Sequence, residues 1–256
     1  MNNLIVLVIF GIISGIIIAG FLAGYLAVYV FNKMPAAWLA DYGETPDESL
    51  MGIRIAKRPY ALVLSVVFVM AFVFLAIQYD GPFYTIPGML ILWLLMLIGI
   101  SDYKYMIIPD QLVLALAVAA LGIIGLDFSA LSGVLPADPY FHQSYASPFL
   151  GALVGGGSIW LIGAIGSFLT KKEAMGFGDV KLLAAIGFLC GLRGILIVLV
   201  ITIFTSGIWF ILLLLTKKIK RGDNKPLGPY IVCACALYLM FRDQINQIVN
   251  WYIGLY

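Results

Sequence analysis

Long apolar runs separated by polar connections dominate this sequence. A helix needs about 20 apolar residues to cross a bilayer. Runs near that length cover residues 4–31, 60–78, 85–101, 111–127, 149–169, 176–192, 194–215 and 227–241. Hydrophobic side chains make up 63% of the 256 residues, which is too apolar for an ordinary soluble domain. We therefore predict an all-α integral membrane protein with about eight transmembrane helices. Two runs are short, so seven spans is an alternative.

The positive charges predict the orientation of these helices, because cytoplasmic loops carry most of the Lys and Arg in membrane proteins. The chain has 15 such residues, and only Arg193 and Arg242 lie outside the connections after the first, third, fifth and seventh runs. The other thirteen (15 minus 2) thus fall on one side. This bias predicts an amino terminus outside the cell and four basic cytoplasmic connections.

The connections differ in length, which suggests how the chain is organised. We expect residues 1–256 to form a single polytopic membrane domain, with a cytoplasmic loop at 32–59 and an external loop at 128–148. The tail at 242–256 mixes apolar and polar residues and suits a helix at the membrane interface. A net charge of +2 gives no excess that would argue for nucleic acid. We expect the protein to be surrounded by membrane lipid.

Two acidic residues lie where the runs meet the predicted cytoplasmic side. Asp102 follows the third run and Asp179 lies near the start of the sixth. An acidic group beside hydrocarbon is costly and is by default a functional candidate. If the two helices are neighbours, the carboxylates could share a water, with one ionised as the base and one protonated. Helix amino ends favour negative charge, so we expect Asp179 to be the ionised partner and Asp102 the protonated one.

Other acidic and titratable residues have simpler interpretations. Asp110 and Asp127 bracket the fourth run, and we expect them to mark the ends of that span. His142 is the only histidine and lies in the predicted external loop. We expect it to be a solvated loop residue rather than a ligand or a base.

The residues around Asp179 are unusual for a membrane helix. Gly176 and Gly178 precede this aspartate, and Lys181 follows it by two residues. Glycines permit tight turns and close approach of an extended peptide. A Gly-x-Gly pair alone is weak evidence for a functional site. The adjacent aspartate, and a second aspartate at the same membrane level, strengthen that evidence.

Three stretches resemble the bacterial type IV prepilin peptidases, which are GxGD-type membrane aspartic proteases. They are DYKYMIIPD at 102–110, EAMGFGDVKLL at 173–183 and PLGPY at 226–230. The resemblance keeps the same order over roughly residues 20–238. The presenilin type of GxGD protease fits less well, because no Tyr precedes Asp102.

This resemblance implies roles for individual residues. In the family, the first aspartate of D-x6-P-D and the aspartate of GxGD are catalytic, which carries over to Asp102 and Asp179. Substrate-binding or supporting roles are implied for the neighbouring motif residues Gly176, Gly178, Lys181, Pro109 and Asp110.

The resemblance also implies a substrate and a location. The family cuts a basic leader from pilin-like precursors, just before a hydrophobic helix that stays in the membrane. We therefore expect an aspartic endopeptidase that acts on prepilin or pseudopilin precursors, for a pilus, secretion or DNA uptake. It would be a multi-pass protein of the bacterial cytoplasmic (inner) membrane, with its active site facing the cytoplasm.

The loop at 32–59 departs from the family pattern. Many members carry two Cys-x-x-Cys pairs there, associated with zinc and with methylation of the new amino terminus, but this loop has no cysteine. We expect no metal and no cofactor for proteolysis, and S-adenosylmethionine only if methyl transfer is retained. Acidic residues could attract a basic leader, although a solvated acidic loop explains them as well; they are Asp41, Glu44, Asp47 and Glu48.

Two other classes of function use the same residues. A proton- or cation-coupled carrier could load its ion on Asp102 and Asp179. That carrier would need an ion gradient, whereas a peptidase acts in detergent without one. A silent scaffold for a membrane assembly would keep its function when both aspartates are replaced. The identity of the precursor and the oligomeric state are left open.

Overall fold

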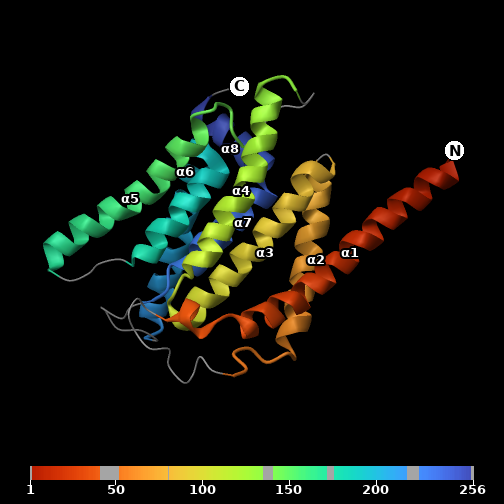
Figure 1. Ribbon diagram of the computed structural model, residues 1–256. Coiled ribbons are helices and arrows are strands. Elements are labelled where there is room, and N and C mark those ends of the chain that lie inside the picture. Colours follow the sequence, from red (N-terminus) through yellow and green to blue (C-terminus); the bar gives the residue numbers. More distant parts are fainter. Residues whose placement is uncertain are drawn as a thin grey trace. The chain divides into compact units, whose positions relative to one another are not determined.

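The computed structural model describes residues 2–40, 52–79, 81–134, 141–171, 176–217 and 225–254, and within these ranges the chain is helical without strands (Figure 1). The predicted all-α fold class is confirmed. The elements are α1 (Asn2–Lys33), η1 (Ala36–Leu39), α2 (Tyr60–Gln78), α3 (Pro82–Tyr105), α4 (Asp110–Leu131), α5 (Ser147–Thr170), α6 (Phe177–Leu215), α7 (Gly228–Met240) and α8 (Arg242–Ile253).

Each predicted apolar run lies in a helix, apart from single residues at the ends of two runs. Six of the described helices, α1 to α6, are long and apolar enough to cross a bilayer, and α7 is a shorter apolar helix of 13 residues. The 39 residues of α6 would reach about 58 Å if straight, nearly twice the roughly 30 Å of a hydrocarbon core. Which terminus lies outside stays a prediction.

A break at Gly191 divides α6 into two apolar segments. Gly191 has φ 70 and ψ 180, which are not helical angles and which a residue with a side chain rarely adopts. A Cβ placed on Gly155 of α5 would meet both Leu183 and Ile195, from opposite sides of the break. The two parts of α6 therefore lie side by side, as the separate runs at 176–192 and 194–215 predicted.

The chain forms two compact units, residues 1–93 and 94–256, and the first contains α1, α2 and the start of α3. Small residues bring α1 and α2 together, as is common where lipid gives no hydrophobic drive. A Cβ on Gly20 would lie 2.7 Å from the Cα of Val69, and Gly24 is packed against Ser65. Ser65 also donates a 2.8 Å hydrogen bond to the carbonyl of Phe21.

The described ends of the 32–59 loop are fixed to α1. The side-chain amide of Asn32 donates to the carbonyl of Ile55 at 2.9 Å, and its oxygen accepts from the backbone of Arg54 at 2.8 Å. Arg54 is 8% exposed and donates to the carbonyl of Phe31 at 3.0 Å. The start of α2 is thereby held beside the end of α1. The acidic residues at 41–48 lie outside the described residues.

The second unit contains the rest of α3 and helices α4 to α8. Glycines bring α5 and α6 into backbone contact, because Gly151 of α5 and Gly187 of α6 have no room for a side chain between them. Arg193, just after the break in α6, donates to the side-chain oxygen of Asn250 in α8. The residues after the break thus lie at the same end of this unit as the tail. An interfacial position for that tail stays a prediction.

The expectation of a solvated His142 is wrong. His142 and Asp127 are both 0% exposed, and the Nδ1 of His142 lies 2.7 Å from the Oδ2 of Asp127. The same oxygen accepts from the backbone N–H groups of Phe141 and His142 at 3.0 Å. Asp127 therefore fixes Phe141 and His142 in the described residues that precede α5, rather than only ending a span. The cause is a pairing across 15 residues, which the local sequence does not reveal.

Candidate active site

The ends of four helices in the second unit carry the predicted site. Asp102 lies in the last turn of α3, and Asp110 is the first residue of α4. Asp179 lies in the first turn of α6, and Gly228 begins α7. A hydrogen bond from Gly228 to Asp102 joins α7 to α3. The start of α6 packs on the turn before α4 through Gly178 and is paired with α4 through Lys181. Residues from distant parts of the sequence are thereby collected at one end of this unit.

Asp102 is buried and has one hydrogen-bond donor among the described residues. It is 4% exposed, and its Oδ2 accepts from the backbone N–H of Gly228 at 2.8 Å. The first N–H groups of a helix have no partner within the helix, so Asp102 caps α7. A carboxylate can accept about four hydrogen bonds, which leaves most of the capacity of Asp102 open.

Asp179 is half-buried at the amino end of α6. Its backbone N–H donates to the carbonyl of Gly176 at 3.3 Å, which forms the turn that starts the helix. Its carboxyl is close enough to Asp102 to interact with it electrostatically. The two predicted catalytic residues therefore face a shared environment, although their roles stay predictions.

The turn between α3 and α4 supports this arrangement. Buried Ser101 donates from its hydroxyl to the carbonyl of Ile107 at 2.8 Å. Pro109 is buried, has an extended backbone (φ −66, ψ 125) and precedes the first residue of α4. A Cβ on Gly178 would lie 3.2 Å from the Cβ of Ile108, so the small residue lets α6 approach this turn. Gly176 is exposed and extended just before α6.

An ion pair joins the starts of α4 and α6. The ammonium of Lys181 donates to both carboxylate oxygens of Asp110 at 2.8 Å. The same ammonium lies 5.0 Å from the ring centre of Phe177. The sequence predicts that Asp110 marks a helix end or supports the site through its motif. The structure places it with Lys181, so both predicted supporting residues hold the amino end of α6.

Gly228 is the site residue that the sequence interpretation missed. The stretch PLGPY at 226–230 belongs to the family resemblance, but the sequence alone predicts no role for its glycine. A Cβ at this position would lie 2.6 Å from the Oδ2 of Asp102, so a larger residue would displace the carboxylate. A glycine between two prolines at the start of a helix was the available signal.

A cavity of about 300 Å³ is lined by residues that neighbour Asp102 and Gly228 in the sequence. Its lining includes Tyr103, next to Asp102, and Pro229, next to Gly228. Phe210 and Tyr230 face each other in its wall with ring centres 5.7 Å apart. The remaining lining residues are Trp209, Leu213, Lys225 and Pro226. The cavity is mainly apolar and aromatic, with one basic group.

The site can support acid–base chemistry between two carboxyls. Like charges that lie close together are difficult to ionise simultaneously, so one protonated and one ionised group is the natural state of such a pair. Within the described ranges, no cluster of three or more His, Cys, Asp or Glu residues could hold a metal. The sequence of the loop at 32–59 contains no cysteine.

Sequence comparisons identify the segment that carries this site. Residues 89–211 match the family described as the type IV leader peptidase family. We refer to residues 89–211 as the leader peptidase domain, after the family that they match. Asp102, Asp110, Asp179 and Lys181 all lie within the leader peptidase domain, whereas Gly228 lies beyond the matched residues.

Individual relatives extend the likeness beyond the leader peptidase domain. The prepilin leader peptidase/N-methyltransferase of Aeromonas salmonicida is 32% identical over 170 residues, covering 66% of this chain and 53% of that protein. The protein of the same name from Xanthomonas campestris pv. campestris is 37% identical over 152 residues, covering 59% and 47%. The one from Pseudomonas aeruginosa is 28% identical over 166 residues, covering 65% and 53%. The chain spans about half the length of these relatives. No solved structure matches it.

Proposed function

We propose that this protein is a membrane aspartic endopeptidase that removes the basic leader from type IV prepilin-like or pseudopilin precursors at the cytoplasmic face. The observation that carries the proposal is the placement of two acidic side chains at helix ends that the turn between α3 and α4 brings together. Asp102 lies in the last turn of α3, and Asp179 lies in the first turn of α6, which packs on that turn through Gly178. They are the two aspartates of the motif, and both lie in the leader peptidase domain. The prepilin peptidase names of the relatives support the substrate class.

In the proposed mechanism, one water lies between the two carboxyls. The ionised carboxylate removes a proton from the water as it attacks the scissile carbonyl, while the protonated one donates to the carbonyl oxygen. Two features compete to decide which residue is ionised. The amino end of α6 favours negative charge on Asp179, whereas the Gly228 N–H favours it on Asp102. We assign the role of base to Asp179, and the pH dependence of the two single variants tests this assignment.

The distribution of charge supports a cytoplasmic position for the site. In the second unit, Lys104 and Lys181 lie at the helix ends that carry the two aspartates. Arg193 lies at the opposite end, together with α8. Basic residues favour the cytoplasmic side, where an unprocessed basic leader would also lie. The bacterial cytoplasmic membrane is the location that we propose.

Methyl transfer is a separate activity and is proposed only conditionally. The relatives' names combine a peptidase with an N-methyltransferase, but residues 32–59 lack the cysteine pairs associated with it. S-adenosylmethionine would be a cofactor only if this chain retains that reaction. No step of leader cleavage requires it.

The direct test uses purified protein in detergent and a precursor peptide with a basic leader and a hydrophobic helix. We expect cleavage by the wild type without an ion gradient, and cleavage slower by about 10³-fold in Asp102→Asn or Asp179→Asn. Mass spectrometry would locate the cut and show any methyl group on the new amino terminus. Unimpaired cleavage by either variant would disprove the proposed mechanism. Ion uptake into vesicles without cleavage would favour the carrier.

A pH series tests the assignment of the two carboxyls. A pair that needs one protonated and one ionised member gives a bell-shaped pH dependence of kcat/KM. Residual cleavage by the two single variants should lose opposite limbs of this bell. If Asp179 is the base, Asp179→Asn removes the acidic limb and Asp102→Asn the alkaline limb. Identical residual profiles would contradict the assignment.

A further inference from the structure

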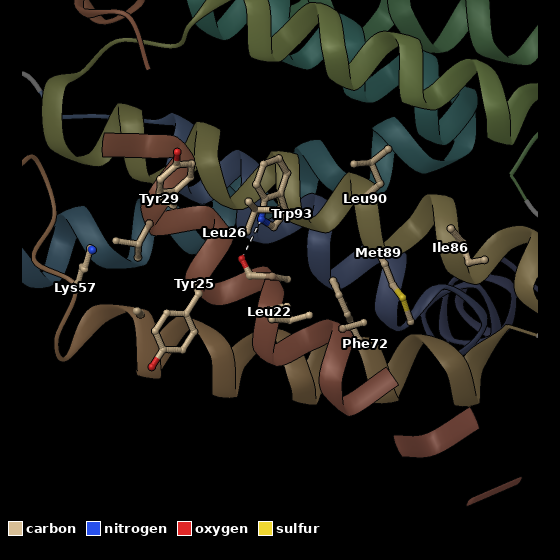
Figure 2. A pocket seen from close by; sticks show the side chains of 14 residues that line it. Leu22, Tyr25, Leu26, Tyr29, Lys57, Phe72, Ile86, Met89, Leu90 and Trp93 are labelled. Carbon is tan, nitrogen blue, oxygen red and sulfur yellow. Dashed lines mark hydrogen bonds between the residues drawn. The ribbon is translucent and has the colours of Figure 1, made fainter. Parts of the chain in front are cut away.

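The first unit contains an apolar groove that the proposed peptidase mechanism does not use. Figure 2 shows it between α1, α2 and the first part of α3, and its volume is about 810 Å³. This size lies within the range of pockets that bind small molecules. The lining residues are Ala19, Leu22, Ala23, Tyr25, Leu26, Val28, Tyr29, Lys57, Ala61, Phe72, Ile86, Met89, Leu90 and Trp93.

The groove has a buried floor and an exposed rim. Val28, Ala61 and Phe72 are 2%, 1% and 4% exposed, whereas Leu26 and Leu90 on the rim are about half exposed. The indole N–H of Trp93 donates to the carbonyl of Ala23 at 3.1 Å, as the dashed line in Figure 2 shows. This bond holds α3 beside α1 and satisfies the polar atom of the indole. The wall is therefore suited to a long apolar chain.

The polar groups of the groove are concentrated at one end. In Figure 2, Tyr25, Tyr29 and Lys57 lie toward one end of the groove, and Ile86 and Met89 lie toward the other. Lys57 is exposed and forms no ion pair with any residue in the described ranges. Its carbonyl accepts from the N–H of Ala61 at 2.9 Å, which fixes its backbone at the start of α2. The groove thus combines an apolar channel with one cationic end.

We propose that this groove binds one anionic phospholipid, with an acyl chain along the apolar wall and the headgroup phosphate at Lys57. Tyrosine and lysine at a membrane boundary are suited to a headgroup. A lysine near a membrane surface favours anionic lipid, whereas a zwitterionic lipid carries its own positive charge beside the phosphate and gains less from Lys57. A basic leader peptide would be repelled by Lys57, so the charge favours lipid over the precursor. The inference does not depend on peptidase activity.

The test measures lipid binding to the full-length protein purified in detergent and stripped of lipid. Native mass spectrometry would follow titrations with phosphatidylglycerol and with phosphatidylcholine of the same acyl chains. We expect one tight phosphatidylglycerol, and Lys57→Gln should weaken it about fivefold, as expected for one lysine near the surface. Lys33→Gln is the matched control, because Lys33 is exposed at the end of α1 but does not line the groove. It should change binding less than twofold, an order-of-magnitude expectation for a charge outside the site.

A second variant tests the apolar part of the groove without altering charge. Ala19 is exposed and lines the groove, so Ala19→Phe should fill it and exclude the acyl chain while leaving α1 intact. A photoreactive acyl chain should crosslink to α1 or α3 in the wild type and lose that crosslink in Ala19→Phe. Glycerophosphoglycerol, the headgroup without chains, should not compete.

Three outcomes would overturn the proposal. The first is equal binding of the two lipids, with no effect of Lys57→Gln. The second is equal weakening by Lys33→Gln and Lys57→Gln, which would indicate general attraction to a basic surface. The third is full competition by glycerophosphoglycerol, which would indicate a site for a free phosphate. Each outcome leaves the peptidase proposal untouched, because none involves Asp102 or Asp179.

Discussion

Two buried carboxylates in the second unit show how different surroundings assign different tasks to the same side chain. Asp102 and Asp127 are 4% and 0% exposed, and each lies toward the carboxyl end of its helix. Negative charge is unfavourable there. The Oδ2 of Asp127 faces three nitrogen groups, two from the backbone and one from His142. Asp102 has a single donor among the described residues, Gly228.

The difference separates a structural carboxylate, Asp127, from Asp102, the carboxylate that we propose to be reactive. Asp127 has its interactions satisfied locally, and the Nε2 of His142 continues the contact to the carbonyl of Phe188 at 3.1 Å. This joins the residues before α5 to α6 near its break. Asp102 keeps unused acceptor capacity beside a second acidic group, an arrangement that is costly in a folded protein. Poorly satisfied polar groups of this kind concentrate at functional sites.

The largest expected effect is on catalysis. Asp102→Asn should lower kcat for leader cleavage by about 10³-fold, within the range for loss of a general acid or base. Asp127→Asn should keep kcat per folded molecule near that of the wild type, because Asp127 contacts the residues before α5 and not the site. Cleavage rates normalised to folded protein would measure both. A comparable loss in the two variants would remove the distinction.

The reverse effect is expected on stability. Asp127→Ala leaves His142 and two backbone N–H groups without their acceptor, and breaking such a buried network costs about 3–5 kcal/mol. Thermal unfolding in detergent should show a clearly lower Tm. Asp102→Ala removes one backbone hydrogen bond together with an unfavourable buried carboxylate, so its Tm should change little. A larger loss of Tm in Asp102→Ala would contradict our interpretation.

The contrast also shows which features the sequence could predict. Hydropathy is a local property, and it located the helices and even the boundary in α6 within a few residues of Gly191. Asp102 and Asp179 were identifiable because an acidic residue beside an apolar run is expensive. The contacts of Gly228 and His142 could not be predicted from the sequence, because their partners lie 126 and 15 residues away. Local patterns do not specify such tertiary pairs.

A smaller effect on cleavage is expected from Gly228. In Gly228→Ala, the new Cβ would lie 2.6 Å from the Oδ2 of Asp102, so the carboxylate must move. Displacing a catalytic group by about 1 Å can cost roughly 10²-fold in rate. Gly207→Ala in α6 is the matched control, since its Cβ would meet nothing within 4 Å. Equal cleavage rates for these two variants would show that the Gly228 contact does not position Asp102.

The smallest effect is expected for the ion pair between Asp110 and Lys181. It is bidentate at 2.8 Å, but its side chains are 40% and 27% exposed, so water weakens the attraction. Pairs of this kind contribute about 0–1 kcal/mol. A double-mutant cycle with Asp110→Asn and Lys181→Met should give a coupling energy in that range when the free energy of unfolding is measured.

The same cycle shows whether this pair positions the site. If it orients the amino end of α6, each single variant should lower kcat/KM only a few-fold, and the double variant should lose no more than either single one. Losses near 10³-fold, as expected for Asp102, would instead give the pair a direct part in the reaction. The partial exposure of the ion pair argues against a direct part in the reaction. Water can take the place of a partner at the surface, but it cannot take the place of a buried acid that acts on a substrate.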